Sequence, residues 1–372
     1  MTFPGKNNLY LIAAAFLLTP LLCIARADGE DKHDPFLSFQ VPESKATFPL
    51  SINEARTVTG YYINKSGVTG GFVRYDDGLI TTFDVPGSIL TEPVSINTAG
   101  DITGFYEISS SNSFLPYVQQ GFVRSADGQI TTFAGDAYTL NGLAPVSINV
   151  TGEIVGNFPD ISFASNFFVR SATGVISTST LSLGANYPTL VTGLNASGAI
   201  VGYESSGQGI YDGFLWDGQG PLPSPASSTG LTGIVVPGST STFPTALNAE
   251  ETVVGCYTEN GLYYDFVRYP DGVIETLNIP GTIPGCLANS GPLGIFEVNP
   301  QSITINDLGT ITGYYTNAAK VSRAFVRFED GTLITFHHPG SRQTIPTGIN
   351  NCDAITGYYS EGTAIVGFIR EP

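Results

Sequence analysis

The chain has 372 residues, of which 42% are hydrophobic and 13% are charged, and its formal net charge is −17. This length and apolar content suffice for one large all-β domain or for two ordinary domains. Binding to phosphate depends on clustered Lys and Arg, so the acidic balance argues against nucleic acid and against an anionic membrane surface as partners.

Residues 1–27 have the features of an export signal. Leu9 to Ala25 is almost wholly apolar, and Ala25-Arg26-Ala27 fits the small-x-small pattern before a cleavage site. An uncleaved membrane anchor is the weaker alternative, because the apolar run is short and Pro20 interrupts it. We predict a signal peptide, a linker over 28–35, and a secreted or periplasmic protein with no transmembrane span after cleavage. Its charge would be −19, from 13 basic and 32 acidic residues.

Seven segments between residue 36 and the C-terminus repeat one another. Each has an Asn preceded by Ile or Leu, a Gly seven positions later, and then a Phe at a variable distance. In the second repeat these anchors are Asn97, Gly104 and Phe122, and Arg124 follows the Phe by two residues. The seven asparagines are Asn53, Asn97, Asn149, Asn195, Asn248, Asn306 and Asn350. Their spacing of 44 to 58 residues is typical of a propeller or another repeat array.

Each repeat is predicted to form four short strands, which we call A to D in chain order. In the second repeat they are Pro93–Asn97, Asp101–Tyr106, Gln120–Ser125 and Gln129–Phe133. Strand A leads to B through Asn-x-x-Gly in four repeats, and C leads to D through Asp-Gly in four repeats, both of which indicate tight hairpin turns.

These tight turns should lie on one face, which we call the turn face. It collects many acidic residues, which we attribute to turn chemistry and solubility. No Asp-rich loop has the ligand spacing of a calcium site, and no CxxC or His/Cys cluster is present, so we predict neither a metal site nor a cofactor.

We assign structural roles to the repeated anchors. The seven Phe side chains have the apolar area of a stabilising core rather than of a binding platform. The seven glycines would let neighbouring sheets approach closely where a side chain would clash. The repeated arginines are expected to pair with a nearby acid, a carbonyl or an aromatic face.

The chain ends indicate how the array closes. The last repeat stops at Gly367–Arg370 after strand C, whereas Phe36–Val41 precedes the first A strand and matches the D-strand segment Ile80–Val85. We therefore predict an all-β fold, a seven-bladed β-propeller over residues 36–372, closed by the N-terminal strand completing the last blade.

The repeat pattern IN-x-x-G-x-I-x-G-Y and the segment Gly213-Phe-Leu-Trp-Asp-Gly218 resemble the HAF family of extracellular repeats. The resemblance extends over all seven repeats. It implies an exported repeat protein, and it carries no reaction to transfer.

Three cysteines would remain after signal cleavage: Cys256, Cys286 and Cys352. At most one pair could then form within the chain. Cys256 with Cys286 is the favoured pair, because a long connection leaves the same repeat and could fold back toward it.

The opposite face, which we call the loop face, should carry long B–C and D–A connections in which the repeats stop resembling one another. Loops on a rigid scaffold commonly carry binding residues. The candidate ligand-binding residues are Tyr117, Phe158, Tyr187, Tyr263, Tyr264, His337 and His338. Loop side chains that merely cover the blade ends are the alternative.

We predict a binding or interaction module for a glycan or a protein partner, since an amphipathic aromatic surface suits either. Nucleophile motifs such as GxSxG and HExxH are missing, so no catalytic residue is assigned. One alternative is a polysaccharide-active enzyme that uses loop-face carboxylates, for which the candidates are Asp160, Glu204, Asp212 and Glu297. Another is a non-catalytic structural surface protein that self-associates.

Overall fold

The computed structural model describes residues 36–112, 115–135, 142–159, 165–179, 188–207, 209–224, 228–279, 282–284, 303–317 and 319–372. The described residues all belong to one compact unit, His33–Pro372. The predicted signal peptide and linker lie outside the described residues.

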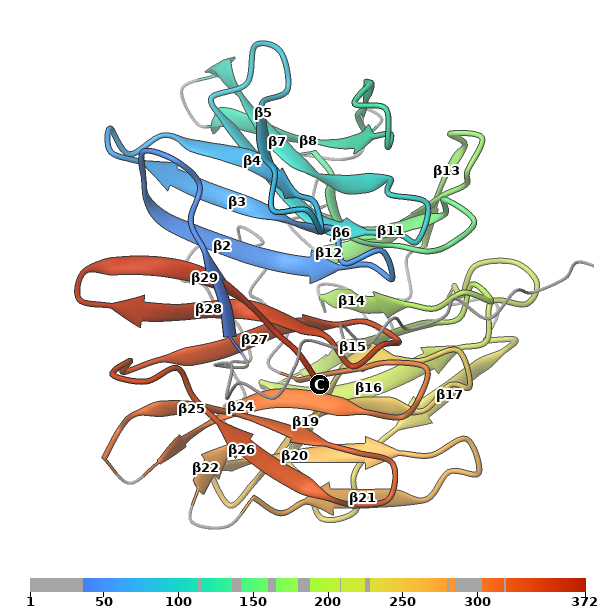
Figure 1. Cartoon of the computed structure of the whole chain (residues 1–372). Helices are drawn as coiled ribbons and strands as arrows, with labels where there is room; N and C mark the ends of the chain where they lie inside the picture. Colours follow the sequence, from blue (N-terminus) through green and yellow to red (C-terminus); the bar gives the residue numbers. More distant parts are fainter. Residues whose placement is uncertain are drawn as a thin grey trace, which may run out of the picture. The chain divides into compact units, whose positions relative to one another are not determined.

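Throughout the described residues the regular structure is β (Figure 1). The first three repeats contribute β2(Ser44–Ile52), β3(Val58–Asn64), β4(Thr69–Arg74) and β5(Ile80–Phe83); β6(Leu90–Ile96), β7(Ile102–Asn112), β8(Leu115–Arg124) and β9(Ile130–Phe133); and β10(Ala144–Ile148), β11(Ile154–Pro159), β12(Ser165–Arg170) and β13(Ile176–Ser179). In each group the four strands pair in chain order and antiparallel. The predicted order A to D is therefore observed.

The remaining repeats follow the same plan. They contribute β14(Thr189–Leu194), β15(Ile200–Gly207), β16(Ile210–Trp216) and β17(Leu231–Ile234); β18(Ser241–Leu247), β19(Val253–Glu259), β20(Leu262–Arg268) and β21(Ile274–Leu277); β22(Thr282–Pro284), β23(Ile303–Ile305), β24(Ile311–Asn317), β25(Ser322–Arg327) and β26(Leu333–Phe336); and β27(Thr344–Ile349), β28(Ile355–Glu361) and β29(Ala364–Arg370). Both β22 and β23 pair with β24.

The first and last repeats meet (Figure 1). β1(Phe36–Phe39) pairs antiparallel with β29, so that Phe36 lies opposite Arg370 and Phe39 opposite Gly367. One parallel bridge, between Ala46 and Ile365, joins β2 to β29. The A strands contact each other in chain order from β2 to β27, and β27 in turn contacts β2.

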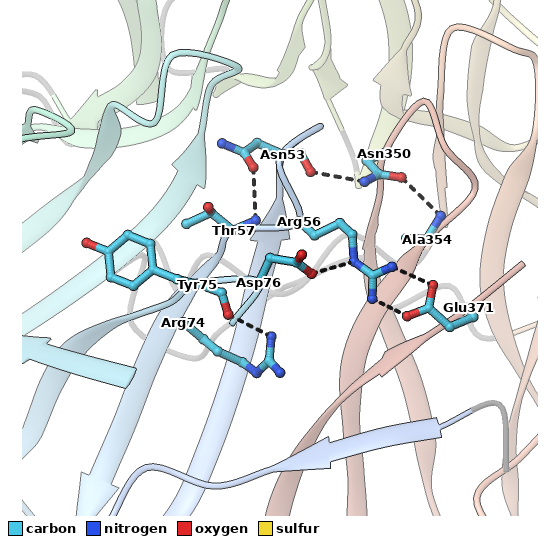
Figure 2. A network of polar contacts seen from close by, with 9 residues as sticks. All are labelled: Asn53, Arg56, Thr57, Arg74, Tyr75, Asp76, Asn350, Ala354 and Glu371. Carbon is cyan, nitrogen blue, oxygen red and sulfur yellow. Dashed lines mark hydrogen bonds and ion pairs between the residues drawn. The ribbon is translucent and has the colours of Figure 1, made fainter. Parts of the chain in front are cut away.

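The seven repeat asparagines form a cycle of hydrogen bonds. Each Nδ2 donates to the backbone carbonyl of the asparagine in the next repeat, at 2.9–3.3 Å, and Asn350 donates back to Asn53 (Figure 2). Each Oδ1 accepts the N–H four residues further on, at 2.9–3.0 Å, which holds the A–B turn. The side-chain amide thus links neighbouring repeats as well as shaping its own turn.

The repeated Phe and Arg pack between successive sheets. Phe122 and the six equivalent Phe side chains are at most 1% exposed. Arg124 lies over the ring of Phe83, a D-strand residue of the preceding repeat, with its Cζ 5.0 Å from the ring centroid. Three further arginines lie in the same way over Phe39, Phe133 and Phe336. The same four arginines each donate a hydrogen bond to the backbone carbonyl of the next residue, so two of the expected partners, the aromatic face and the carbonyl, are used together.

The repeated glycines have a different role from the one expected. A Cβ on Gly104 would lie 2.1 Å from the backbone carbonyl oxygen of Glu92 and 2.7 Å from the Cα of Pro93. Both atoms belong to strand β6 of the same repeat, where a register shift between Pro93 and Ser95 marks a bulge. The close approach is therefore within one sheet, between a B strand and its bulged A strand, and not between neighbouring sheets.

The loop face is more regular than predicted. Four D–A connections have the same compact turn, with Pro after the first residue, Ser at the fourth and Thr at the seventh: 41–47, 85–91, 236–242 and 338–344. In each, the Thr Oγ1 accepts the N–H of the first residue at 3.0–3.1 Å and lies 2.9–3.1 Å from the Ser Oγ. Some B–C links are equally tight, since Glu259 pairs directly with Leu262.

Candidate functional site

The turn face has a depression of about 170 Å³ at the centre of the asparagine cycle. Its lining includes the asparagines of the first five repeats together with Glu54, Val150 and Asp307. Burial raises the pKa of Glu54, which accepts the N–H of Asn351. Asp307 accepts hydrogen bonds from the N–H of Ala249 and from Nδ2 of Asn351. Because these carboxylates already bind groups of neighbouring repeats, we assign them to the cycle rather than to a ligand.

An ion pair adds to the junction of the first and last repeats on this face. The Arg56 guanidinium contacts both carboxylate oxygens of Glu371, and its Nε lies 2.9 Å from Asp76 Oδ1 (Figure 2). The C–D turn acids have the expected turn chemistry: the Oδ1 of Asp77, Asp127, Asp217, Asp271 and Asp330 accepts the N–H two residues further on.

The predicted ligand-binding aromatics do not form one site. Phe158 is only 4% exposed and packs in the core with Leu143 and Phe168, so its ring is not available at the surface. Tyr187 lies outside the described residues. Tyr117 is 53% exposed on β8.

Tyr264 stacks on Tyr257 at 5.3 Å between ring centroids, inside its own repeat. It lies next to Tyr263 on β20, and neighbouring residues of a strand point to opposite faces of the sheet. The two tyrosines therefore contribute to different surfaces.

The two histidines also differ. His338 stacks on Tyr359 with ring centroids 3.6 Å apart and meets the edge of Phe36 at 5.4 Å, so it packs against β1 and β28. His337 is exposed, and its partial burial together with the charge of Arg323 lowers its pKa.

Tyr263 does join an aromatic cluster at the loop-face ends of repeats four and five. Tyr203 contacts the edges of Tyr211 and Phe243 at 5.7 and 5.2 Å between centroids, and Tyr263 packs against the same group. We call Tyr203, Tyr211, Phe243 and Tyr263 the aromatic patch, in which the three tyrosines are half-buried.

Two of the four carboxylate candidates lie together. Glu204 on β15 and Asp212 on β16 are direct cross-strand partners, and Thr189 on β14 is the direct partner of Glu204 on its other side. Directly opposite residues of an antiparallel pair point to the same side of the sheet, with Cβ atoms about 5 Å apart. Asp160 and Glu297 lie outside the described residues.

At the position of Glu204, two residues after the repeat glycine, the other six repeats have an aromatic residue. The equivalents are the aromatic residues Tyr62, Tyr106, Phe158, Tyr257, Tyr315 and Tyr359. Burial and the charge of Asp212 raise the pKa of Glu204 to about 7. A carboxyl group thus stands where an aromatic ring packs in every other repeat, opposite a second carboxyl group.

The aromatic patch and this carboxyl pair occupy different sides of the repeat-four sheet. Tyr203 and Glu204 are neighbours on β15, as are Tyr211 and Asp212 on β16, so their side chains alternate. The patch faces repeat five, where Phe243 lies. Ile200 and Phe214, which share the side of the carboxyl pair, pack against Val155 of repeat three.

Cys256 and Cys352 are both disulfide-bonded. Cys286 lies outside the described residues, so the pairing with Cys256 stays a prediction. The described residues contain no cluster of three or more His, Cys, Asp or Glu side chains suited to a metal ion. They also contain no helix that is long and apolar enough to cross a membrane.

Comparison with known proteins places the fold among β-propellers. A streptogramin B lyase matches with a TM-score of 0.54 and 14% identity over 90% of this chain and 96% of its own. Virginiamycin B lyase from Staphylococcus aureus matches with a TM-score of 0.53 and 12% identity over 91% and 98%. The propeller domain of the Trilobed protease from Pyrococcus furiosus, described as having an open velcro topology, matches with a TM-score of 0.55 and 8% identity over 87% and 96%.

At these identities the likeness concerns the fold alone: the chain has an all-β, propeller-like architecture. No family model and no curated protein matches the sequence.

Sequence reasoning missed Tyr203, Tyr211 and Thr189. The signal for the first two was present, because Tyr203 directly follows the repeat glycine Gly202 and Tyr211 precedes the repeat Phe214 by three residues. Their contact with Phe243 depends on how repeat four packs on repeat five. The sequence pattern within one repeat does not show this packing.

Proposed function

We propose that the seven repeats form the seven blades of a closed propeller, in which β1 is the fourth strand of the last blade. The asparagine cycle supports this count, because it passes once through every repeat and returns to Asn53. The arginine contacts support the role of β1: Arg124 covers the D-strand Phe83 of the preceding repeat, and Arg74 covers Phe39 of β1.

The glycine before the repeat Phe gives a second, independent argument for this closure. A Cβ on Gly71 would meet Phe83 of its own D strand and Pro93 of the next A strand, at 2.9 and 2.8 Å. A Cβ on Gly367 would meet Phe39 and Pro49, both at 2.8 Å. β1 thus contacts the last repeat as that repeat's own D strand would, and the first repeat contacts it as the following blade would.

We further propose that the protein is exported, as its N-terminal sequence and its resemblance to HAF repeats suggest, and that it works as a binding module for a glycan or a protein segment. The observation that carries this function is the aromatic patch. Tyr203, Tyr211 and Tyr263 are half-buried rings with polar hydroxyl ends, and they pack around Phe243. Rigid rings with polar tips suit sugar faces and protein side chains alike, at little cost in conformational entropy.

Substitution of Tyr263 by Ser tests this function. The side chain is half-buried, so the variant should keep its fold, while loss of one ring of the patch should weaken binding at least tenfold. The matched control is Tyr264→Ser, since Tyr264 is also half-buried on the same strand but points to the other side of the sheet. Both variants and the parent protein would be titrated with an oligosaccharide panel, and with extracellular proteins from the same source. Equal affinity of Tyr263→Ser and the parent for every ligand found would refute the assignment of the patch.

An enzyme remains the alternative function, and Glu204 with Asp212 is the observation that favours it. A carboxyl group with a pKa of about 7 beside a second carboxyl group is a common acid–base arrangement. By their names, the two lyases of similar fold act on streptogramin B and on virginiamycin B. Against a catalytic role, the pair faces repeat three and the aromatic patch faces repeat five, so they do not line one cleft. Product formation from a bound glycan, lost in Glu204→Gln, would favour the enzyme.

A further inference from the structure

Repeat four departs from the others in a row of three polar side chains across its sheet. Thr189, Glu204 and Asp212 occupy register-matched positions on β14, β15 and β16, so all three point to the same side. No other repeat combines a Thr, an acid and a second acid in this row; in repeat two, for example, the row is Thr91, Tyr106 and Gln120.

Two oxygens of this row are buried without a hydrogen-bond partner. They are Oε2 of Glu204 and Oγ1 of Thr189, a residue that is only 1% exposed. In four other repeats the equivalent threonine accepts a backbone N–H from the preceding D–A turn. Thr189 is the exception, and it is the one that lies directly opposite a carboxyl group.

The arrangement is unfavourable for the protein alone. Like charges directly opposite each other destabilise an antiparallel pair, and a buried polar atom without a partner costs about 1–3 kcal/mol. The described side chains on the facing side of repeat three are neutral: Asn157 is occupied by the backbone of Val191, and Phe167 is apolar. No Lys, Arg or His of the described facing strands offsets the two acids.

We propose that Thr189, Glu204 and Asp212 form a binding site for a divalent cation that prefers oxygen ligands, with Ca²⁺ as the best fit. The three side chains offer up to five oxygens, and Ca²⁺ takes six to eight, including waters, in a flexible geometry. A cation would neutralise the carboxyl pair and give the unpartnered oxygens a ligand. The site joins three strands of one sheet at its contact with repeat three, so its occupation should stabilise the folded state.

Ca²⁺ titration of the purified protein at pH 8, monitored by thermal unfolding and calorimetry, tests this site. A site filled to about 100 times its dissociation constant should raise the unfolding midpoint by about 3–5 °C, with one ion bound per chain. Glu204→Gln and Asp212→Asn should each abolish the shift, and Thr189→Val should reduce it.

Two further variants separate site loss from misfolding. Glu204→Tyr introduces the residue type of the other repeats, so it should fold without Ca²⁺ and show no shift with it. Glu107→Gln is the matched control, because Glu107 is another partly buried B-strand glutamate whose cross-strand partner, Gln119, is neutral. It should keep the full shift.

Failure to bind Ca²⁺, or an undiminished shift in Glu204→Gln, would overturn the proposal. The outcome is independent of the proposed binding function, because Tyr263→Ser alters the sheet of repeat five and should leave the Ca²⁺ shift unchanged.

Discussion

Asn195→Asp is the most direct test of the asparagine cycle, because it replaces one nitrogen by an oxygen of nearly the same size. Nδ2 of Asn195 donates to the carbonyl of Asn248 at 3.0 Å, while its Oδ1 accepts the N–H of Ser197 and of Ala199. An aspartate keeps the acceptor and loses the donor. Its second oxygen would face the carbonyl oxygen of Asn248, at a position that is almost fully buried.

The expected loss of stability is about 2–4 kcal/mol. A buried carbonyl left without its donor costs about 1–3 kcal/mol, and an oxygen–oxygen contact of an ionised carboxylate adds to this. An unfolding entropy of about 2 cal/mol/K per residue over more than 300 residues converts this loss into a fall of about 3–6 °C in the unfolding midpoint. The burial should also raise the pKa of the new carboxyl group, so that the loss is largest at neutral pH. It should shrink at acidic pH, where the protonated group can donate its O–H to the carbonyl.

Thermal and urea unfolding at pH 7.5 and pH 4.5 would measure these losses relative to the parent protein at each pH. Asn64→Asp is the matched control, because Oδ1 of Asn64 accepts the N–H of Ser66 and Val68 in an exposed turn, and an aspartate retains that role. It should be neutral within about 0.5 kcal/mol. If Asn195→Asp unfolded like Asn64→Asp at both pH values, the donor would have no part in holding the repeats together, and our account of the cycle would be wrong.

Three further predictions concern pH, turn conformation and closure. Burial raises the pKa of Asp265 to about 7, so the folded chain holds a proton that the unfolded chain releases near pH 4. The free energy of unfolding should therefore fall by up to about 4 kcal/mol as the pH rises between these values. Asp265→Asn should remove this slope in unfolding measured from pH 4.5 to 8, whereas the exposed control Asp330→Asn should keep it. Glu251 has a φ of 63° at the turn position where four repeats have Gly, so Glu251→Gly should raise the free energy of unfolding by up to about 1 kcal/mol in urea titrations, and a loss of stability would contradict this. Deletion of residues 36–42 removes β1 and the ring of Phe39, and should lower the midpoint by many degrees; unchanged melting would refute the closure by β1.

The carboxyl pair falls where repeat four differs from its neighbours, because Glu204 replaces an aromatic residue on the side toward repeat three. The aromatic patch instead follows the repeat pattern, since Tyr358 of the last repeat meets Phe48 of the first at 5.2 Å as Tyr203 meets Phe243. A repeat array has the same scaffold at every position, so a local departure from the pattern is where a specific ligand contact is expected. Elsewhere, as at Phe122 and Arg124, the repeated residues maintain the packing between sheets.

The sequence alone determined the repeat and its strands. The fixed distance from Asn97 to Gly104 and the Asp-Gly turns depend on backbone geometry within one hairpin, which neighbouring residues specify directly. The match of Phe36–Val41 to a D strand likewise anticipated the pairing of β1 with β29.

Only the tertiary structure decided what the anchors contact. The amide of Asn97 reaches Asn149, which is 52 residues away, and Gly104 is needed for a bulged strand of its own sheet rather than for a neighbouring one. The site residues were less predictable still: Phe158 is in the core, Tyr263 lies in the patch, and Glu204 stands between Thr189 and Asp212. The physical reason is that side-chain environment depends on register between strands and on packing between repeats, both of which join residues that are distant in the chain.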